Sequence, residues 1–328
     1  MIIAVDAAGG DHYPKSPVTG AVEATKVHDS LKVILTGPEE IIQNELKNLD
    51  YAADRVIVHH APEIVGMDEA PAQAVKTKRN SSIAAGNGLI KAGKCDGFVS
   101  AGNTGALLAA STFILGKLEG VLRPTIAAIY PTVNGPRLLI DAGANLEMRT
   151  EMYVQFAQMG SIYAKQVMDV KEPRIGLLNV GEEDEKGTDE LKEAFKALKA
   201  RPNFIGNLEG KDIMAGKADV FICDGLVGNL LLKLGESIPS VLEKFIGRAA
   251  KKMDLQPEQL KLVSKVLKNS LAEFNPDTVG GVPFLGVNGV SLVGHGGSSP
   301  KAIKNLILNA VKCVENNIND EIVASLKS

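Results

Sequence analysis

The 328-residue sequence contains no tryptophan, and aromatic side chains make up only 4% of it. An aliphatic core is therefore expected, and proteins that hold single-stranded nucleic acid by base stacking rely on aromatic side chains that are scarce here. The formal net charge of −3 adds no basic field that would attract a nucleic acid. We therefore predict no nucleic-acid partner.

Cysteine and clustered metal ligands are also scarce. The three cysteines, Cys95, Cys223 and Cys313, are far apart and show no metal-ligand spacing. An odd, scattered set suits a reducing compartment better than a disulfide framework. The chain starts with a short apolar run and no basic segment, which predicts a strand and not a signal peptide. The composition thus favours a cytoplasmic protein without a metal site.

Apolar runs and helical segments alternate along the first part of the chain. Strands are expected at residues 2–6, 32–36, 56–60 and 97–100, and helices at 18–27, 39–49, 72–77, 82–91 and from 104. This alternation predicts an α/β fold built from parallel βαβ units. Right-handed crossovers would place most of the turns that follow strands at one edge of the sheet.

The second part continues this pattern but contains one hairpin. An Asn-Gly turn at 132–135 joins the strands expected at 125–130 and 137–141, so the sheet should be mixed and mostly parallel. The remaining elements are expected as helices at 150–167, 188–198 and 300–317, strands at 174–179, 220–223 and 290–293, and a helical region from 229 to about 274 that breaks near 256–257.

Two domain organisations fit this pattern. The chain forms either a single domain, 1–328, or two lobes made of 1–118 with 275–328 and of 119–274. In both cases a helical pair at about 229–274 is expected to project from the rest.

A glycine-flanked turn follows the strand expected at 97–100. Its sequence is Ser100-Ala-Gly-Asn-Thr-Gly-Ala106, and a helix of small residues begins at Thr104. Unpaired N–H groups and the peptide dipoles at a helix start favour an anion. Gly102 lets the backbone approach a ligand closely, and Asn103 and Thr104 add side-chain donors. We interpret this turn as a phosphate site; a strand-to-helix turn without a ligand is the alternative.

Similar turns follow other expected strands. Each is an apolar run followed by a polar residue and glycines: Asp6-Ala-Ala-Gly-Gly-Asp11, Asp141-Ala-Gly-Ala-Asn145, Asn179-Val-Gly-Glu182, Asp224-Gly-Leu-Val-Gly-Asn229 and Gly294-His-Gly-Gly-Ser298. Ligands of open α/β sheets bind at the carboxyl ends of parallel strands. We therefore expect these turns to form one shared site.

Two ionisable residues in these turns are candidates for catalysis. His295 lies in a glycine-rich strand end, although a lone histidine is more often structural. Lys186 follows an acidic run at 182–185 and could reach a shared anion; a solvated surface lysine is the alternative. Cys223 adjoins Asp224, but no activating base can be placed beside it, so a thiol nucleophile is not expected.

Nucleotide-binding motifs are incomplete. Residues 88–95 nearly match a P-loop, but Cys95 occupies the Ser/Thr position and the strand follows the motif instead of preceding it. No Gly-x-Gly-x-x-Gly follows the first strand, which argues against a nicotinamide-dependent enzyme.

Together with Gly280-Gly281, the turn motifs resemble those of the bacterial phosphate acyltransferases, the acyl-carrier-protein:phosphate acyltransferases of phospholipid synthesis. The matching motifs run in order from residue 6 to residue 298, so the resemblance covers nearly the whole chain. Two departures are visible. Ala8 stands where the family usually has Met, and Leu226-Val227 replaces a Phe-Thr pair.

This resemblance implies a three-layer α/β/α, Rossmann-like fold similar to the isocitrate and isopropylmalate dehydrogenases and the phosphotransacetylases. It implies a homodimer that transfers a long-chain acyl group from acyl carrier protein to inorganic phosphate. The acyl phosphate would pass to a membrane glycerol-3-phosphate acyltransferase. No organic cofactor or metal is required, and the protein would act in the cytoplasm, in peripheral contact with the inner face of the membrane. Beside this interpretation three alternatives stay open: a decarboxylating dehydrogenase of the same fold, a non-catalytic scaffold for acyl carrier protein, and a phosphotransacetylase that uses acyl-CoA.

The resemblance also implies roles for the turn residues. The phosphate is expected at Gly102, Asn103, Thr104 and Lys186, and His295 is expected to stabilise the thioester carbonyl oxygen or the departing thiolate. The remaining predicted site residues shape the site or orient its donors: Asp6, Gly9, Gly10, Asp11, Ser100, Asp141, Asn145, Asn179, Asp224 and Asn229. We count His295, Lys186 and Asn179 as the catalytic candidates.

The predicted helical pair carries concentrated positive charge. Residues 240–270 contain seven lysines and arginines against three acidic residues, in a chain whose total charge is negative. Apolar residues recur there at helical spacing. We predict a surface that attracts acidic acyl carrier protein or anionic lipid; two ordinary amphipathic helices with solvated lysines are the alternative.

Overall fold

The computed structural model describes residues 1–274 and 280–327. Its strands, in chain order, are β1 (Ile2–Asp6), β2 (Lys32–Gly37), β3 (Val56–His60), β4 (Gly97–Ser100), β5 (Thr125–Tyr130), β6 (Arg137–Ile140), β7 (Ile175–Leu178), β8 (Phe204–Leu208), β9 (Val220–Ile222), β10 (Val282–Leu285) and β11 (Val290–Val293).

The α-helices are α1 (Lys15–Val27), α2 (Glu39–Leu46), α3 (Pro71–Thr77), α4 (Ser82–Lys91), α5 (Thr104–Ala110), α6 (Thr150–Gln166), α7 (Asp189–Leu198), α8 (Gly210–Met214), α9 (Gly225–Lys252), α10 (Pro257–Ser270), α12 (Pro300–Glu315) and α13 (Ile318–Lys327). A π-helical turn, Ser111–Leu115, continues α5, and a 3-10 turn, Ala272–Phe274, follows α10.

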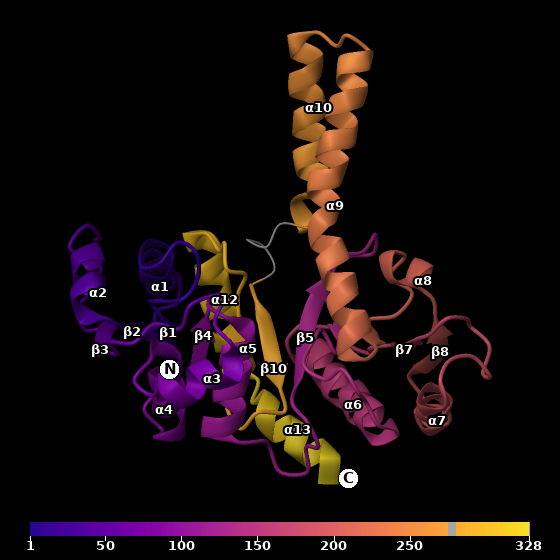
Figure 1. Ribbon diagram of the computed structural model, residues 1–328, viewed down its shortest axis with the longest axis horizontal. Helices are drawn as coiled ribbons and strands as arrows, with labels where there is room; N and C mark the ends of the chain where they lie inside the picture. Colours follow the sequence, from indigo (N-terminus) through magenta and orange to yellow (C-terminus); the bar gives the residue numbers. More distant parts are fainter. Residues whose placement is uncertain (275–279, 328) are drawn as a thin grey trace.

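All strands of the described residues form one 11-stranded sheet in the order β3-β2-β1-β4-β11-β10-β5-β6-β9-β7-β8. Helices cover both faces of this sheet, which gives three layers (Figure 1). Most neighbouring strands are parallel. The predicted α/β fold with a mixed, mostly parallel sheet is therefore confirmed, as is the antiparallel hairpin of β5 and β6.

The sheet consists of two parallel blocks that run in opposite directions. Strands β3, β2, β1, β4 and β11 form the first block, and β6, β9, β7 and β8 form the second. Three antiparallel pairings separate them: β11 with β10, β10 with β5, and β5 with β6. The turns after β1 to β4 therefore share one edge, as predicted for the first part of the chain. The turns after β6, β7 and β9 lie at the opposite edge, because the chain direction reverses between the blocks.

Four elements have weak signals in the sequence and were not predicted: β8, α8, β10 and α13. Strand β10 has only four residues and includes Pro283, which cannot donate a backbone hydrogen bond. Strand β8 contains Gly206 and Asn207, two residue types that are depleted in strands. Their pairings with neighbouring strands compensate for these weak local preferences.

The core is mostly aliphatic, although several of its largest buried side chains are aromatic, and it lies on both faces of the sheet. In the first block, α1, α2 and α12 pack on one face, and α4 and α5 pack on the other. In the second block, α6, α7 and α13 share one cluster with Phe156 and Tyr163 at its centre. In the two-lobe alternative residues 318–327 would belong to the first lobe, and in the structure they form α13 and pack against α6.

Helices α9 and α10 form a hairpin that stands away from the rest of the molecule (Figure 1). The break between them falls near Gln256-Pro257, as predicted: α9 ends at Lys252 and α10 begins at Pro257. Helix α9 begins earlier than the predicted residue 229, because Asp224 caps it and accepts a hydrogen bond from the Val227 N–H. Across the residues that the structure describes, we find no helix with the length and hydropathy of a bilayer span.

Candidate active site

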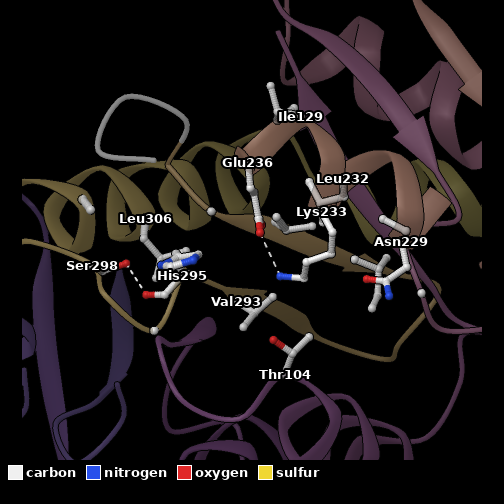
Figure 2. Close-up of a pocket in the computed structure, with 18 of the residues that line it drawn as sticks. Thr104, Ile129, Asn229, Leu232, Lys233, Glu236, Val293, His295, Ser298 and Leu306 are labelled. Carbon is white, nitrogen blue, oxygen red and sulfur yellow. Dashed lines mark hydrogen bonds and ion pairs between the residues drawn. The ribbon is translucent and has the colours of Figure 1, made fainter. Parts of the chain in front are cut away.

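A cleft of about 560 Å³ opens on the sheet face that carries α5 and α9. Strand residues such as Ile126, Val282 and Val293 contribute to its lining, and α5 and α9 contribute Thr104 and Asn229. Figure 2 shows side chains of α9 and of the turn after β11 directed into this space. The cleft therefore brings together residues from both parallel blocks, although their strand ends do not share an edge.

The turns after β1 and β4 are joined by a buried hydrogen-bond chain. The Ser100 hydroxyl donates to Asp6 Oδ2 over 2.6 Å, and the Gly102 N–H donates to Ser100 Oγ over 2.9 Å. Burial raises the pKa of Asp6 above its ordinary value, while the hydrogen bond from Ser100 lowers it. The Asp6 carboxylate thus helps to connect the two turns, and the Gly102 N–H is used within the protein.

Glycines after β1 allow these turns to lie against each other. A Cβ on Gly9 would lie 2.5 Å from Asp6 Oδ2, and Gly10 has a φ of +89°. The Asp11 N–H donates to the Gly296 carbonyl over 2.8 Å, so the turns after β1 and β11 are also connected. Asp11 lines the cleft.

Asn103 has a structural role that the sequence did not indicate. Its Oδ1 accepts from the Ala106 N–H and caps α5, and its Nδ2 donates to the carbonyls of Met67 and Glu69 over 2.9 and 3.0 Å. These bonds occupy the side chain that we predicted to bind phosphate. Thr104, which lines the cleft, is the member of this pair whose side chain is exposed.

His295 lies at the cleft beside Leu306 and Ser298, and its side chain is exposed (Figure 2). Its Nδ1 accepts a hydrogen bond from the Gly297 N–H over 3.1 Å, and its carbonyl accepts one from the Ser298 hydroxyl over 2.6 Å. Because Nδ1 accepts, we assign the proton of the neutral ring to Nε2. His295 can therefore offer an N–H donor to a bound substrate.

The second block contributes a buried framework around Asp141. This carboxylate accepts hydrogen bonds from the N–H groups of Ile126, Ala144 and Asn145, and the Asn145 side chain donates to it over 2.8 Å. Burial raises the pKa of Asp141, and the hydrogen bond from Asn145 opposes that shift. These two residues position the loop that ends beside Asn229.

Asn179 and Lys186 do not line the cleft. They follow β7, which β9 separates from β6. The Asn179 side chain makes hydrogen bonds within its own turn. Its Nδ2 donates to the Lys186 carbonyl over 3.0 Å, and its Oδ1 accepts from the Val180 N–H. Lys186 is exposed. The reversed direction of the second block thus keeps these two candidates away from the residues around His295.

The structure adds two cleft residues that sequence analysis missed. Lys233 and Glu236 lie on α9 and form an ion pair of 2.9 Å within the cleft (Figure 2). With Asn229 and Leu232 they occupy positions i, i+3, i+4 and i+7, which is one face of a helix. This spacing was visible in the sequence, but nothing local distinguished it from a solvated helix face.

The cysteines do not provide a reactive thiolate. Cys95, Cys223 and Cys313 are buried and free. Burial raises the pKa of Cys95 to about 11 and that of Cys313 to about 12, and it raises the pKa of Cys223 as well. In residues 1–274 and 280–327, no group of three or more His, Cys, Asp or Glu side chains is placed to hold a metal ion.

Comparisons of the sequence find related proteins over nearly the whole chain. The family model described as "Fatty acid synthesis protein" matches residues 1–321. A phosphate acyltransferase from Chlorobaculum parvum is 45% identical, and the match covers 99% of each chain.

Two solved structures have a similar fold. A phosphotransacetylase from Streptococcus pyogenes aligns with a TM-score of 0.62 at 17% identity, covering 96% of this chain and 94% of that one. A 4-hydroxythreonine-4-phosphate dehydrogenase from Klebsiella pneumoniae aligns with a TM-score of 0.55 at 13% identity, covering 96% and 98%. At such identities the likeness concerns the fold alone, and it agrees with the predicted fold class.

Proposed function

The chain belongs to the phosphate acyltransferase family and is an acyltransferase, and from this premise we propose that it transfers a long-chain acyl group from acyl carrier protein to inorganic phosphate. Acyl transfer to phosphate is the activity that the family supports. The carrier protein as donor, the long chain, and the use of the acyl phosphate in phospholipid synthesis are the proposal.

The observation that carries this proposal is the mixed character of the cleft. Its lining combines polar side chains, among them His295 and Thr104, with apolar side chains such as Leu108, Leu232 and Leu306. A long-chain acyl thioester has the same two parts, because its reacting carbonyl is polar and its chain is apolar. Burial of the chain would supply binding free energy of about 0.8 kcal/mol for each CH₂ group.

The chemistry needs positioning more than a strong base. An oxygen of hydrogen phosphate attacks the thioester carbonyl, the C–O bond forms, and the C–S bond breaks. The proton of hydrogen phosphate is left for the departing thiolate, so the products are an acyl phosphate and a thiol. His295 Nε2–H would donate to the developing oxyanion or to the leaving sulfur. The buried Asp6 and Asp141 would hold the turns in place without touching the phosphate.

The hairpin of α9 and α10 suits an acidic carrier protein. A shallow groove on α9 has Val241 and Phe245 beside the basic residues Lys244, Arg248 and Lys251. Phe245 is 54% exposed, and α10 has no buried residue along its described length. Electrostatic attraction to such a surface would speed the encounter with an acidic partner.

The proposal includes the setting of the reaction. The enzyme would work as a homodimer in the cytoplasm, in peripheral contact with the inner face of the membrane. There it would release acyl phosphate to a membrane glycerol-3-phosphate acyltransferase. Exposed apolar side chains on the hairpin, including Leu234, Leu262 and Val266, give such contacts a physical basis.

The direct test is thiol release from purified acyl carrier protein that carries a long acyl chain, with and without phosphate. We expect release that depends on phosphate and is faster than release from acetyl-CoA. Faster reaction with acetyl-CoA would instead favour a phosphotransacetylase. Binding of the carrier protein without turnover would indicate a scaffold, and dinucleotide-dependent oxidation would indicate a dehydrogenase.

A further inference from the structure

Lys233 is the only lysine or arginine among the described residues that line the cleft. The other ionisable side chains there include two carboxylates, Asp11 and Glu236, and the imidazole of His295. Lys233 is 61% exposed, and its ammonium group lies 2.9 Å from Glu236 Oε2. Figure 2 shows the side chain extending from α9 toward Val293 and Thr104, across the cleft.

Close contacts of two glycines hold α9 in the orientation that places Lys233 at the cleft. A Cβ on Gly228 would lie 1.8 Å from the Asp141 carbonyl oxygen, and a Cβ on Gly235 would lie 2.9 Å from the Tyr130 ring. Both glycines let the helix lie directly against the strand ends of β5 and β6. Because these glycines flank Lys233 in sequence, rotation of the helix would turn larger side chains toward the strand ends, and the close packing therefore keeps residue 233 on the cleft face.

Binding of a phosphate dianion in this cleft requires a cation nearby, because two carboxylates already line it. A phosphate dianion placed between Thr104 and His295 would share the cleft with Asp11 and Glu236, and like charges repel at these distances. Asn103 has no free side-chain donor, the Gly102 N–H is bound to Ser100, and Lys186 is not at the cleft. Lys233 can neutralise part of the phosphate charge, and a flexible lysine stem can exchange one anion for another.

On the premise that the protein transfers acyl groups to phosphate, we propose that Lys233 binds the inorganic phosphate in the cleft. In the free enzyme Glu236 holds the ammonium group on the cleft face. Phosphate then takes the place of this carboxylate as the partner of Lys233. This role belongs to a residue of the second block, whereas the predicted phosphate turn belongs to the first.

The test is Lys233→Met, which keeps the apolar stem and removes the charge. We expect the KM for phosphate to rise about 10- to 100-fold, the range for loss of a hydrogen bond to a charged group. The KM for the acyl donor should stay near that of the wild type. Lys233→Arg should recover most of the phosphate affinity, because it retains a cation.

Lys196→Met is the matched control. Lys196 forms an ion pair of 2.8 Å with Glu193 at a spacing of three residues on α7, outside the cleft, and its loss should leave both KM values unchanged. Melting curves of the two Met variants would show that both are folded, since each removes only an exposed helical ion pair of small energy.

An unchanged KM for phosphate in Lys233→Met would overturn the proposal. So would a rise in the KM for acyl carrier protein alone, because Lys233 would then contact the phosphate of the carrier's prosthetic arm. Titration with inorganic phosphate in the absence of an acyl donor separates this inference from the proposed function. If the wild type binds phosphate, Lys233→Met does not, and no acyl transfer is found, Lys233 keeps its role and the proposed reaction fails.

Discussion

The lower and upper parts of α9 are built in different ways. In the lower part, from Gly225 to Glu236, three glycines are buried against the body and the side chains of Asn229 and Lys233 face the cleft. In the upper part, from Val241 to Lys252, Ala250 is the one buried residue. The lower part is held in place by its packing against the sheet. The upper part contacts little of the body, so its surface is available to bind a partner.

The largest effect is expected from Gly228→Ala in the lower part. The added Cβ would lie 1.8 Å from the Asp141 carbonyl oxygen, so α9 must move away from the strand end. Overpacking of this kind costs about 1–3 kcal/mol of folding stability, and misplacement of about 1 Å can cost on the order of a hundredfold in rate. Thermal melting and turnover of the variant would measure both.

Gly247→Ala in the upper part is the matched change. A Cβ there would have no heavy atom within 4 Å. Alanine in a helix interior is favoured over glycine by about 0.5–1 kcal/mol, so this variant should melt at the same or a higher temperature and keep its turnover. Equal behaviour of the two variants would remove the distinction between the two parts.

His295→Ala tests the hydrogen-bond donor that we propose for the developing oxyanion or the leaving sulfur. Loss of one donor to a developing oxyanion typically costs about 100-fold or more in kcat. The melting temperature should change little, because the His295 side chain is exposed. The control is His59→Ala, an exposed histidine on β3 that is not a cleft residue. Near wild-type turnover in folded His295→Ala would contradict the assigned role.

Charge reversal tests the upper part of the hairpin. Lys251, Lys252 and Lys261 are all exposed, and their joint replacement with Glu should weaken carrier-protein binding, with the largest loss at low salt. Turnover of a small thioester that needs no carrier protein should be unchanged, since these residues are remote from the cleft lining. Equal affinity for the carrier protein before and after charge reversal would indicate that the segment is an ordinary pair of amphipathic helices with solvated lysines.

The smallest effect on chemistry is expected at the cysteines. Replacement of Cys95, Cys223 and Cys313 by Ala or Ser should leave turnover within about tenfold, because buried thiols with a raised pKa are poor nucleophiles. Mass spectrometry of the enzyme mixed with the acyl donor tests independently whether an acyl group becomes attached to the protein. An acyl group trapped on any of these cysteines would establish a covalent mechanism and contradict direct transfer to phosphate.

Local sequence signals predicted most elements of the body and the hairpin. The alternating apolar pattern indicated β1 to β4, and the Asn-Gly turn indicated the β5–β6 hairpin. The reversed direction of the second block depends on β10, whose four residues include a proline and pair with β5, a strand far away in sequence. A local pattern cannot report such a pairing.

The candidate site was predictable where glycine turns mark it. His295 and Thr104 come from the turn motifs and line the cleft, and the carboxylates of Asp6 and Asp141 accept hydrogen bonds within their turns. Their roles in binding and catalysis stay predictions. Lys233 was missed because a helical lysine near a basic segment has the same local pattern whether it faces solvent or a cleft. Lys186 was preferred for its glycine turn, and the strand order places that turn elsewhere.

The most direct test of the central claim follows labelled inorganic phosphate into product. The enzyme is incubated with labelled phosphate and acyl carrier protein that carries a long acyl chain, and the acyl phosphate and the released carrier thiol are both quantified. We predict that labelled acyl phosphate and the thiol form in equal amounts, and that neither product forms when phosphate is left out. Thiol release without phosphate, or with free fatty acid as the product, would contradict it.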